Sequence, residues 1–336
     1  MKLKVSKKQY NYCPQTREEL DDLLDQLLKE RGWEADLNDI DVSNITDMSG
    51  LFAKFREGIN NFKYNKDYDF SKFNGDISEW DVSNVKDMSD MFSHCNSLDC
   101  NLSKWDVSNV KDMKNMFCWC EKFEGKGLEN WDVSNVTNMR NMFAECFYFE
   151  GKGLENWDVS NVTEMECMFY HCNNLDCNLS KWDVSNVTEM KYMFFGCKEF
   201  EGKGLENWDV SNVTNMRNMF AECKKLNCNL SNWDVSNVTD MWKMFSGCKE
   251  FEGKGLENWD VSNVTEMSDM FSNCNSLDCN LSNWDVSNVT DMGYMFAECK
   301  KLNCNLSNWD VSNVIYMNGI FYKCPIKNKY KPKFKK

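Results

Sequence analysis

The amino-acid sequence predicts an α/β repeat solenoid of about eleven stacked coils. The tetrapeptide DVSN occurs eleven times, at steps of 25 or 26 residues from Asp81 onward, and Trp, Met, Phe and Cys recur at fixed places in most units. A unit of this length is too short to fold alone, so each one must bury its apolar residues against its neighbours. One elongated body is therefore expected in place of the two or three compact domains that 336 residues would allow.

Residues 1–36 precede the repeats, and residues 14–32 have the pattern of an amphipathic capping helix. Thr16 is the expected N-cap with Glu19 three residues later, and Gly32 ends the helix. The apolar stripe comprises Leu20, Leu23, Leu24, Leu27 and Leu28. Such a helix would cover the open end of the stack, and a dimerisation helix is the alternative.

Each repeat of the solenoid, residues 37–324, is expected to hold one short strand and one short helix or 3₁₀ segment. After DVSN, one face of a helix of about 8 to 10 residues would carry the apolar residues Val85, Met88, Met91, Phe92 and Cys95. The Thr of NVT, as in Thr163, is placed to cap that helix. Residues 97–105 alternate apolar and polar side chains, which indicates a strand that stacks into a parallel sheet.

The regular unit is modified at three places. The form FEGKGLENW is one residue longer than LDCNLSKW and carries two Gly, which indicates a bulge or a wider turn. The first two DVSN start at Asp41 and Asp81, 40 residues apart, so a loop insertion is expected at about 54–73. The tail 325–336 is basic and is expected to be a solvated end, with an anionic docking tail as the alternative.

The invariant apolar positions are interpreted as core, each against a functional alternative. Ten Trp from Trp80 to Trp309 form one column, which could instead be an exposed strip that binds sugar rings. Two Met columns could bind copper(I), but Leu51 and Ile320 replace Met at the ends of the second column, which suits packing.

The polar and thiol columns indicate no reaction chemistry. Eighteen Cys favour buried thiols over disulfides, because CxxxxC pairs recur in only some repeats; Cys118 and Cys167 lie outside the columns and are the expected exposed thiols. With no CxxC and only two His, a zinc site is not expected. The Asp and Asn of DVSN are expected to close turns and form a ladder, with calcium binding as the alternative. The sequence therefore predicts neither an enzyme nor a cofactor.

Composition excludes two further classes. The net charge of −14 argues against a general nucleic-acid binder, because a phosphate backbone would be repelled. No apolar run approaches the roughly 18 residues of a membrane span, and the first residues lack the apolar segment of a signal peptide. A cytoplasmic or virion-associated location is therefore expected.

The unit NLSKWDVSNVTEMKYMFFGCKEF resembles the repeats of the BspA-like leucine-rich repeat family of bacterial surface proteins, which also occur in lipoproteins, protist and viral proteins. The resemblance covers about residues 37–324 through the signature WDVSNVTxMxxMFxxC. It implies a right-handed, leucine-rich-repeat-like solenoid, a role in adhesion or protein binding, and no catalytic residue. The surface members carry a signal peptide, a lipid-attachment Cys or an anchor, of which this sequence shows none.

Binding residues are expected where the repeats differ: the pair between the two Met, the pair after MF and the pair after the Cys. Through the middle of the array these positions become aromatic, and neighbouring coils would bring them into one patch. The candidate binding residues are Trp119, Phe147, Tyr148, Tyr170, Tyr192 and Phe195, with Trp242 and Tyr294 further along the array. Drift at tolerant surface positions is the alternative.

The sequence thus favours a non-catalytic recognition or adhesin-type solenoid, expected to be a monomer, that binds an unknown protein partner. The main alternative is a structural or assembly component, such as a virion-associated protein. Carbohydrate binding through an aromatic strip is a remote alternative.

Overall fold

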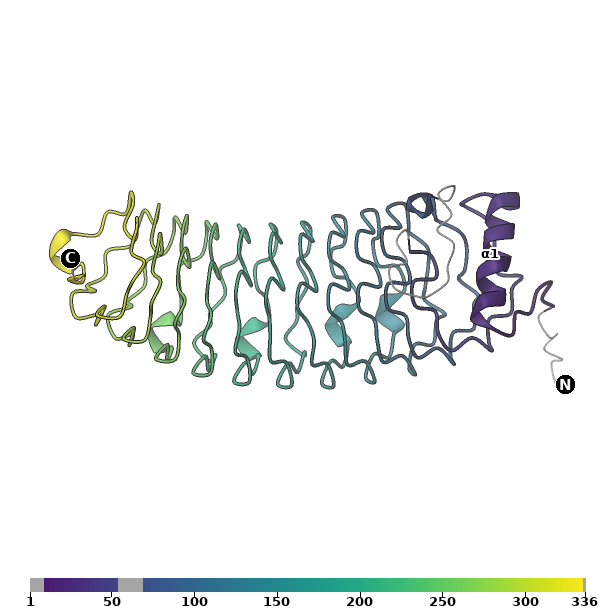
Figure 1. Cartoon of the computed structure of the whole chain (residues 1–336), viewed down its shortest axis with the longest axis horizontal. Coiled ribbons are helices and arrows are strands. Elements are labelled where there is room, and N and C mark those ends of the chain that lie inside the picture. Colours follow the sequence, from purple (N-terminus) through teal and green to yellow (C-terminus); the bar gives the residue numbers. More distant parts are fainter. Residues whose placement is uncertain (1–8, 54–68, 335–336) are drawn as a thin grey trace.

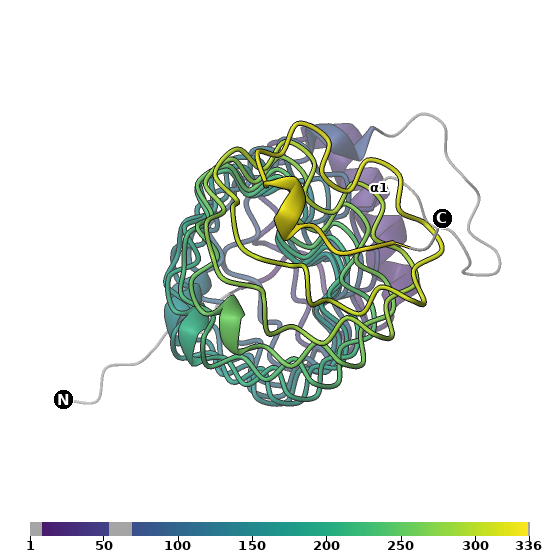
Figure 2. The same ribbon diagram turned by 90° about the vertical axis from the view of Figure 1, so that its left-hand side faces the viewer.

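The coils stack along one axis into an elongated rod, with helix α1 (Arg17–Arg31) at one end and the C-terminal segment at the other (Figure 1). The computed structural model describes residues 9–53 and 69–334, so most of the predicted insertion at 54–73 lies outside them. Viewed along the rod, successive coils superimpose on one outline (Figure 2). The predicted repeat solenoid is confirmed, but the local structure of its units differs from the prediction.

Helix α1 lies over the N-terminal end of the core. The Thr16 hydroxyl oxygen accepts a hydrogen bond from the Glu19 N–H at 3.2 Å, and the Glu19 carboxylate accepts one from the Gln15 N–H at 2.6 Å. Gly32 ends the helix at a φ of 87°, and its N–H donates to the Leu28 carbonyl. The buried residues of α1 are Leu20, Asp21, Leu24, Leu27 and Leu28. The four Leu belong to the same apolar cluster as the coils.

Six 3₁₀ segments are the other helical elements in the described residues: η1 (Phe70–Lys72), η2 (Leu128–Asn130), η3 (Leu154–Asn156), η4 (Leu205–Asn207), η5 (Leu256–Asn258) and η6 (Asn328–Tyr330). Elements η2 to η5 occur in the four coils of the longer FEGKGLENW form. At Gly127, where φ is +94°, an added Cβ would lie 2.2 Å from the Ser103 nitrogen of the preceding coil. The extra residue is therefore absorbed by a tight 3₁₀ turn that requires Gly. None of the described helices has the length and apolar character that a bilayer span requires.

The predicted helix after each DVSN is wrong: consecutive turns take its place. The Met91 N–H donates to the Met88 carbonyl at 3.2 Å and the Cys95 N–H to the Phe92 carbonyl at 2.9 Å, three residues back in each case. Within these turns Asp90 and His94 are left-handed, with φ values of 58° and 66°. Apolar residues three or four apart face the core here as they would on a helix, so spacing alone did not separate the two structures.

Backbone hydrogen bonds between coils explain why turns replace the helix. The N–H of Asp90 donates to the Lys114 carbonyl at 2.7 Å, and the N–H of Phe92 donates to the Met116 carbonyl at 2.9 Å. Groups that would bond within a helix therefore bond to the next coil, as in a parallel sheet. The stack itself supplies the acceptors, so no helix is needed to satisfy the backbone.

The predicted strand at 97–105 is also absent, and the parallel pairing lies elsewhere. It consists of single-residue bridges such as Asp87 with Asp112, one between each pair of neighbouring coils from Asp47 to Tyr316. The Thr of NVT borders this line and does not cap a helix, since the Thr163 hydroxyl donates to the Thr137 carbonyl of the preceding coil at 3.3 Å. The expected strand-and-helix coil is therefore a coil of turns with a narrow parallel ladder.

The Trp column lies in the core. Its ten members are between 2 and 6% exposed, and Trp105 and Trp131 are parallel with ring centroids 6.4 Å apart. The Trp131 indole N–H also donates to the Leu102 carbonyl of the preceding coil at 3.2 Å. An exposed sugar-binding strip formed by these residues is thereby ruled out. The Met and Phe columns are fully buried beside them in the interior coils.

All eighteen cysteines are free thiols. Nine thiols, one in each coil from Cys95 to Cys299, donate to a Phe carbonyl of the preceding coil, as Cys120 does to Phe92 at 3.1 Å. Burial raises the pKa of the Cys120 thiol well above its usual value. The prediction that Cys118 and Cys167 are exposed is wrong, because both are half-buried; Cys13, which the columns did not single out, is the exposed thiol.

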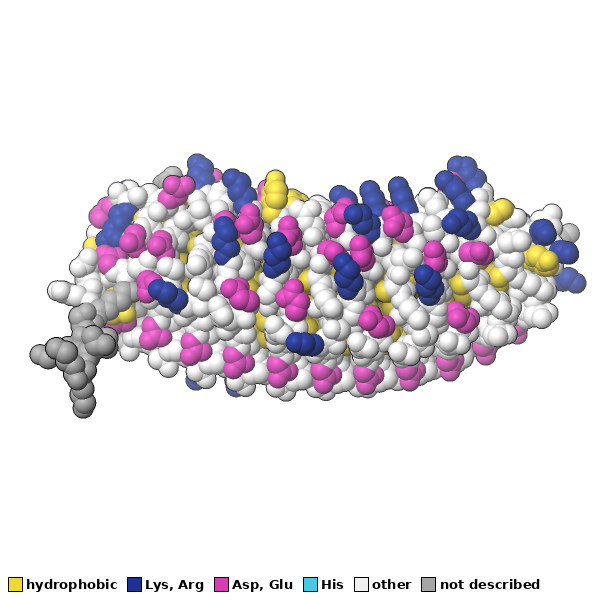
Figure 3. Space-filling view, turned by 180° about the vertical axis from the view of Figure 1, so that it is seen from behind, with side chains coloured by type: hydrophobic (Ala, Val, Ile, Leu, Met, Phe, Trp, Pro, Cys, Tyr) yellow, Lys and Arg dark blue, Asp and Glu magenta, His cyan; other side chains and the backbone are white. Residues whose placement is uncertain are grey.

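The DVSN residues close turns and connect coils, as predicted. The Asp106 carboxylate accepts hydrogen bonds from the Ser108 N–H at 3.1 Å and the Ser108 hydroxyl at 2.6 Å. The Asn109 amide donates to the Ser83 carbonyl of the preceding coil at 2.8 Å, and this ladder bond recurs along the stack. Figure 3 shows acidic side chains in a regular row along one edge of the rod.

Candidate functional site

Aromatic side chains from neighbouring coils meet in the middle of the rod. The rings of Tyr170 and Phe195 stack with centroids 5.0 Å apart and an 11° interplanar angle. Tyr192 lies 6.2 Å from Tyr170, and His171 packs edge-on against Phe195 at 5.1 Å. We call these four residues together with Trp119 the aromatic face; Trp119 occupies the turn position of His171 two coils earlier, is 38% exposed and stacks on His94 at 5.9 Å.

The turn backbone places these side chains on the surface. Trp119, His171 and Tyr192 occupy left-handed positions, with φ values of 63°, 58° and 57°. Consecutive Met and Phe, such as Met168 and Phe169, are fully buried, whereas the pairs between these buried residues point outward. A non-glycine residue in this conformation costs about 1 to 2 kcal/mol, and other coils place Gly196 or Gly247 there.

The titratable side chains at the aromatic face are half-buried. Burial, followed by the charge of Lys198, lowers the pKa of His171, so the imidazole is neutral at pH 7. Burial also raises the pKa of the Tyr170 phenol and that of the Glu145 carboxyl, with the Glu121 charge adding to the second effect. The face therefore offers apolar rings, neutral polar groups and one acidic side chain.

The other predicted residues lie apart from this face. Trp242 is held between two cations, with the Arg217 guanidinium carbon 3.8 Å and the Lys243 ammonium 4.5 Å from the ring centroid. Tyr294 is 48% exposed and has no ring contact among the described residues. Phe147 and Tyr148 directly follow Cys146, so they lie in a different part of the coil from the residues between or just after the two Met. Of the predicted residues, Tyr170, Tyr192 and Phe195 therefore contact one another through their rings. That the eight residues bind a partner stays a prediction.

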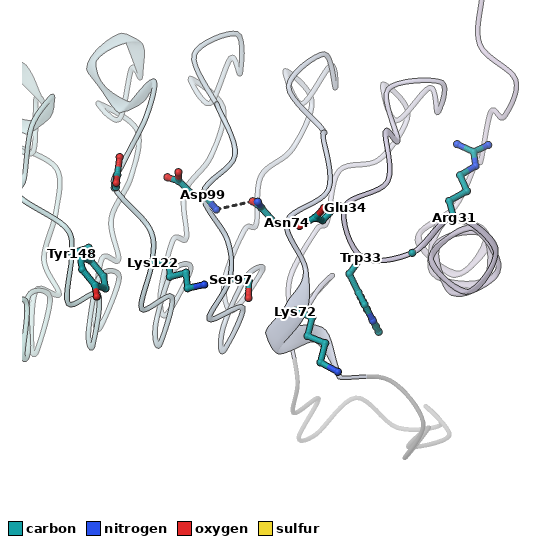
Figure 4. Close-up of a pocket in the computed structure, with 11 residues that line it drawn as sticks. Arg31, Trp33, Glu34, Lys72, Asn74, Ser97, Asp99, Lys122 and Tyr148 are labelled. Carbon is teal, nitrogen blue, oxygen red and sulfur yellow. Dashed lines mark hydrogen bonds between the residues drawn. The ribbon is translucent and has the colours of Figure 1, made fainter.

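Tyr148 belongs to a groove at the N-terminal half of the rod. The groove encloses about 870 Å³ and is lined by Arg31, Gly32, Trp33, Glu34, Lys72, Asn74, Ser97, Asp99, Lys122, Glu124 and Tyr148 (Figure 4). The Asp99 N–H donates to the Asn74 side chain across neighbouring coils at 2.9 Å. A second groove of about 740 Å³ shares Glu124 and Tyr148. Both grooves mix acidic and basic side chains, without a cluster of aromatic rings.

Sequence reasoning missed His94, His171 and Glu145 as parts of the site. His94, Trp119, Glu145 and His171 occupy the same place in successive units, two residues after the conserved Phe. All four residues of this column have a left-handed backbone conformation. Aligning the variable columns by position, and not only by aromatic content, would have identified them.

A protein-family model matches the chain along most of its length. The model, described as a Mycoplasma protein of unknown function, DUF285, matches residues 23–152, 117–230, 142–254 and 241–334. No curated protein matches the chain.

Among solved structures, a leucine-rich-repeat protein of Leptospira interrogans is 11% identical, with 70% of this chain and 66% of that chain covered and a TM-score of 0.23. The TLR13–ssRNA13 complex is 10% identical, with 81% and 59% covered and a TM-score of 0.18. The chain therefore spans less than two thirds of either structure's length. Both TM-scores are too low to support an inference about function.

Proposed function

Because this chain belongs to the DUF285 family, whose description assigns no activity, we propose from its geometry that it is a non-catalytic recognition solenoid that binds a protein through the aromatic face. The likeness of its units to BspA-like repeats, with their role in adhesion or protein binding, agrees with this proposal. The function rests on the variable turn residues, and the repeated columns serve only to hold them in place.

The observation that carries the proposal is the convergence of the half-buried rings of Tyr170, Tyr192 and Phe195 at turns of neighbouring coils, with Tyr192 in a left-handed conformation. Rigid aromatic side chains on an ordered backbone lose little conformational entropy on binding, and they dominate the energy of protein interfaces. The inter-coil backbone hydrogen bonds hold these positions, as in the donation from the His171 N–H to the Phe195 carbonyl at 2.7 Å.

Charge and shape favour a protein over the other ligand classes. The net charge of −14 opposes a nucleic acid, and the mixed lining of the grooves offers no apolar pocket for a small molecule. An apolar surface of several adjoining rings, bordered by Glu145 and Lys198, has the layout of an interface core with a polar rim.

Affinity capture tests the proposal. The full chain, a face variant (Trp119→Ala, Tyr170→Ala, Tyr192→Ala) and a control variant (Trp242→Ala, Tyr294→Ala) are each immobilised and exposed to an extract of the producing cell. We expect the wild type and the control to retain the same partner and the face variant to retain at least about tenfold less. Equal capture by all three folded proteins contradicts the proposal.

A further inference from the structure

At the end of the rod opposite α1, the described residues leave part of the core uncovered. Met317 is 39% exposed, whereas Met292, one coil earlier in the same column, is fully buried. Ile315, Tyr316 and Tyr322 beside it are 69, 62 and 53% exposed. This coil therefore presents to solvent the surface that every interior coil buries against its neighbour.

The sequence of this coil departs from the others at the same place. The ten earlier units carry Thr or Lys where Ile315 stands, and Asp, Asn or Glu where Tyr316 stands. Two columns that are polar elsewhere thus become apolar only here. Exposed apolar residues in place of polar ones indicate a contact surface and not a solvated end.

The backbone of the same coil has hydrogen-bond donors without acceptors. In the preceding coil, the N–H groups of Met292 and Tyr294 donate to the Tyr316 and Asn318 carbonyls, each at 2.9 Å. Four N–H groups at alternate positions of this coil form no hydrogen bond with the described residues: those of Met317, Gly319, Phe321 and Lys323. These N–H groups form an open edge of the parallel ladder, and a partner that supplies acceptor oxygens can pair with it.

The following segment covers only the other side of this end and brings cations to it. The Leu306 N–H donates to the Tyr330 carbonyl at 2.8 Å, and Ile326 is buried. Lys331 lies over the Phe321 ring at 5.4 Å, and no acidic residue follows Asp310. Basic and apolar side chains accordingly gather at this end of the rod (Figure 3). A matching surface must be acidic.

Helix α1 provides such a surface at the opposite end of the rod (Figure 1). Its exposed side chains include four acids, Glu18, Glu19, Asp22 and Glu30, and two bases in the last turn, Lys29 and Arg31, so the surface is acidic on balance. Carboxylates only accept hydrogen bonds, so they suit both the open N–H groups and the Lys side chains. The opposite locations of the two ends allow two rods to meet in line.

We propose that a second copy of this chain docks the outward side of α1 onto the uncovered coil around Ile315, Tyr316 and Met317. The contact is heterologous, because it joins different surfaces of the two copies. Such a contact leaves one free surface of each kind and adds further copies into a linear assembly. The surface is distinct from the aromatic face, which stays accessible along the side of the rod.

Sedimentation velocity of the full chain, over a concentration series, tests the proposal. At about 50 mM salt we expect the weight-average mass to rise at least about twofold above the 39.5 kDa of one chain, and at about 500 mM salt to fall toward it. The variant Ile315→Thr, Tyr316→Asp, which restores the residues of the interior coils, should stay at one chain's mass. A wild type that stays at one chain's mass at every concentration overturns the proposal.

Charge reversal identifies which ends meet. A helix variant (Glu18→Lys, Asp22→Lys) and a tail variant (Lys327→Glu, Lys329→Glu), each with a folded circular-dichroism spectrum, should be monomeric alone and associate when mixed in equal amounts. Association of the helix variant by itself would show that α1 is not the docking surface and would overturn the proposal.

Discussion

The indole N–H of Trp182 donates a hydrogen bond to the carbonyl of Leu154, 2.9 Å away in the preceding coil. Each of the ten Trp of the column makes the equivalent bond to a residue of the coil before it. The column therefore fixes the register between coils as well as filling the core, because only one stacking offset satisfies every indole.

Replacing Trp182 by Phe should lower the free energy of unfolding by about 1 to 3 kcal/mol, since the buried Leu154 carbonyl loses its donor. Urea denaturation measures the change. Trp119→Phe is the matched control, because Trp119 is 38% exposed, and it should change stability by less than about 0.5 kcal/mol. Equal effects at the two positions would argue against the role of the inter-coil bond.

The aromatic face depends on Gly196. A Cβ at this residue would lie 2.5 Å from His171 Nδ1, and its φ of +75° disfavours any side chain. Gly196→Ala should cost about 1 to 3 kcal/mol in stability and displace the His171 ring. Gly247→Ala is the control at the same turn position, where the added Cβ meets the flexible carboxylate of Glu222. Shifted NMR signals of the His171 ring in the first variant, and unchanged ones in the control, are expected.

Alkaline pH should destabilise the rod steeply. Burial raises the pKa of Cys120 and Cys146 well above 9.0, and that of Cys100 and Cys177 to about 12. A thiol whose pKa is higher in the folded than in the unfolded chain stabilises the fold fully below its unfolded pKa. This stabilisation is lost as the pH rises toward its folded pKa. Each such thiol then lowers the free energy of unfolding by about 1.4 kcal/mol per pH unit above pH 9. Denaturation midpoints between pH 8 and 11 measure the slope, and Cys120→Ala should reduce it by about one proton.

Acid should loosen the DVSN turns. The Ser160 hydroxyl, and then the Ser160 N–H, lower the pKa of Asp158 below 3.8, and the same arrangement lowers the pKa of Asp209, Asp234, Asp260 and Asp285. A carboxyl whose pKa is lower in the folded than in the unfolded chain stabilises the fold above its unfolded pKa. This stabilisation is lost as the pH falls through its folded pKa. Thermal melts from pH 5 to 2 should show this loss, and Ser160→Ala should weaken it. An unchanged pH dependence in that variant would contradict the role of the hydroxyl.

The columns of the core were predictable because stacking forces each coil to repeat the same buried residues. The helix was not, because Met88, Met91 and Cys95 have the spacing of a helix face and of consecutive turns alike. The discriminating signal was present: Gly196 and Gly247 occur in the middle of the predicted helix, at a position that is left-handed in every described coil of the array. Gly is a poor residue for a helix interior and a good one for such a turn.

The candidate site was predictable only in part. Sequence variation placed Tyr170, Tyr192 and Phe195 on the surface, and the structure brings their rings together. The separation of Tyr148 from that cluster depends on the direction of the chain after Cys146. That direction comes from the turn conformations, which the sequence pattern did not specify.

The most direct test of recognition through the aromatic face is site-specific photo-crosslinking. A photoreactive phenylalanine analogue replaces Tyr192 in one protein and Tyr294 in another. Both residues occupy the same turn position, with φ values of 57° and 55°, and three coils lie between their own. After illumination with the captured partner, we expect a crosslink from position 192 and none from position 294. A crosslink only from position 294, or equal yields from both, would contradict binding through the aromatic face.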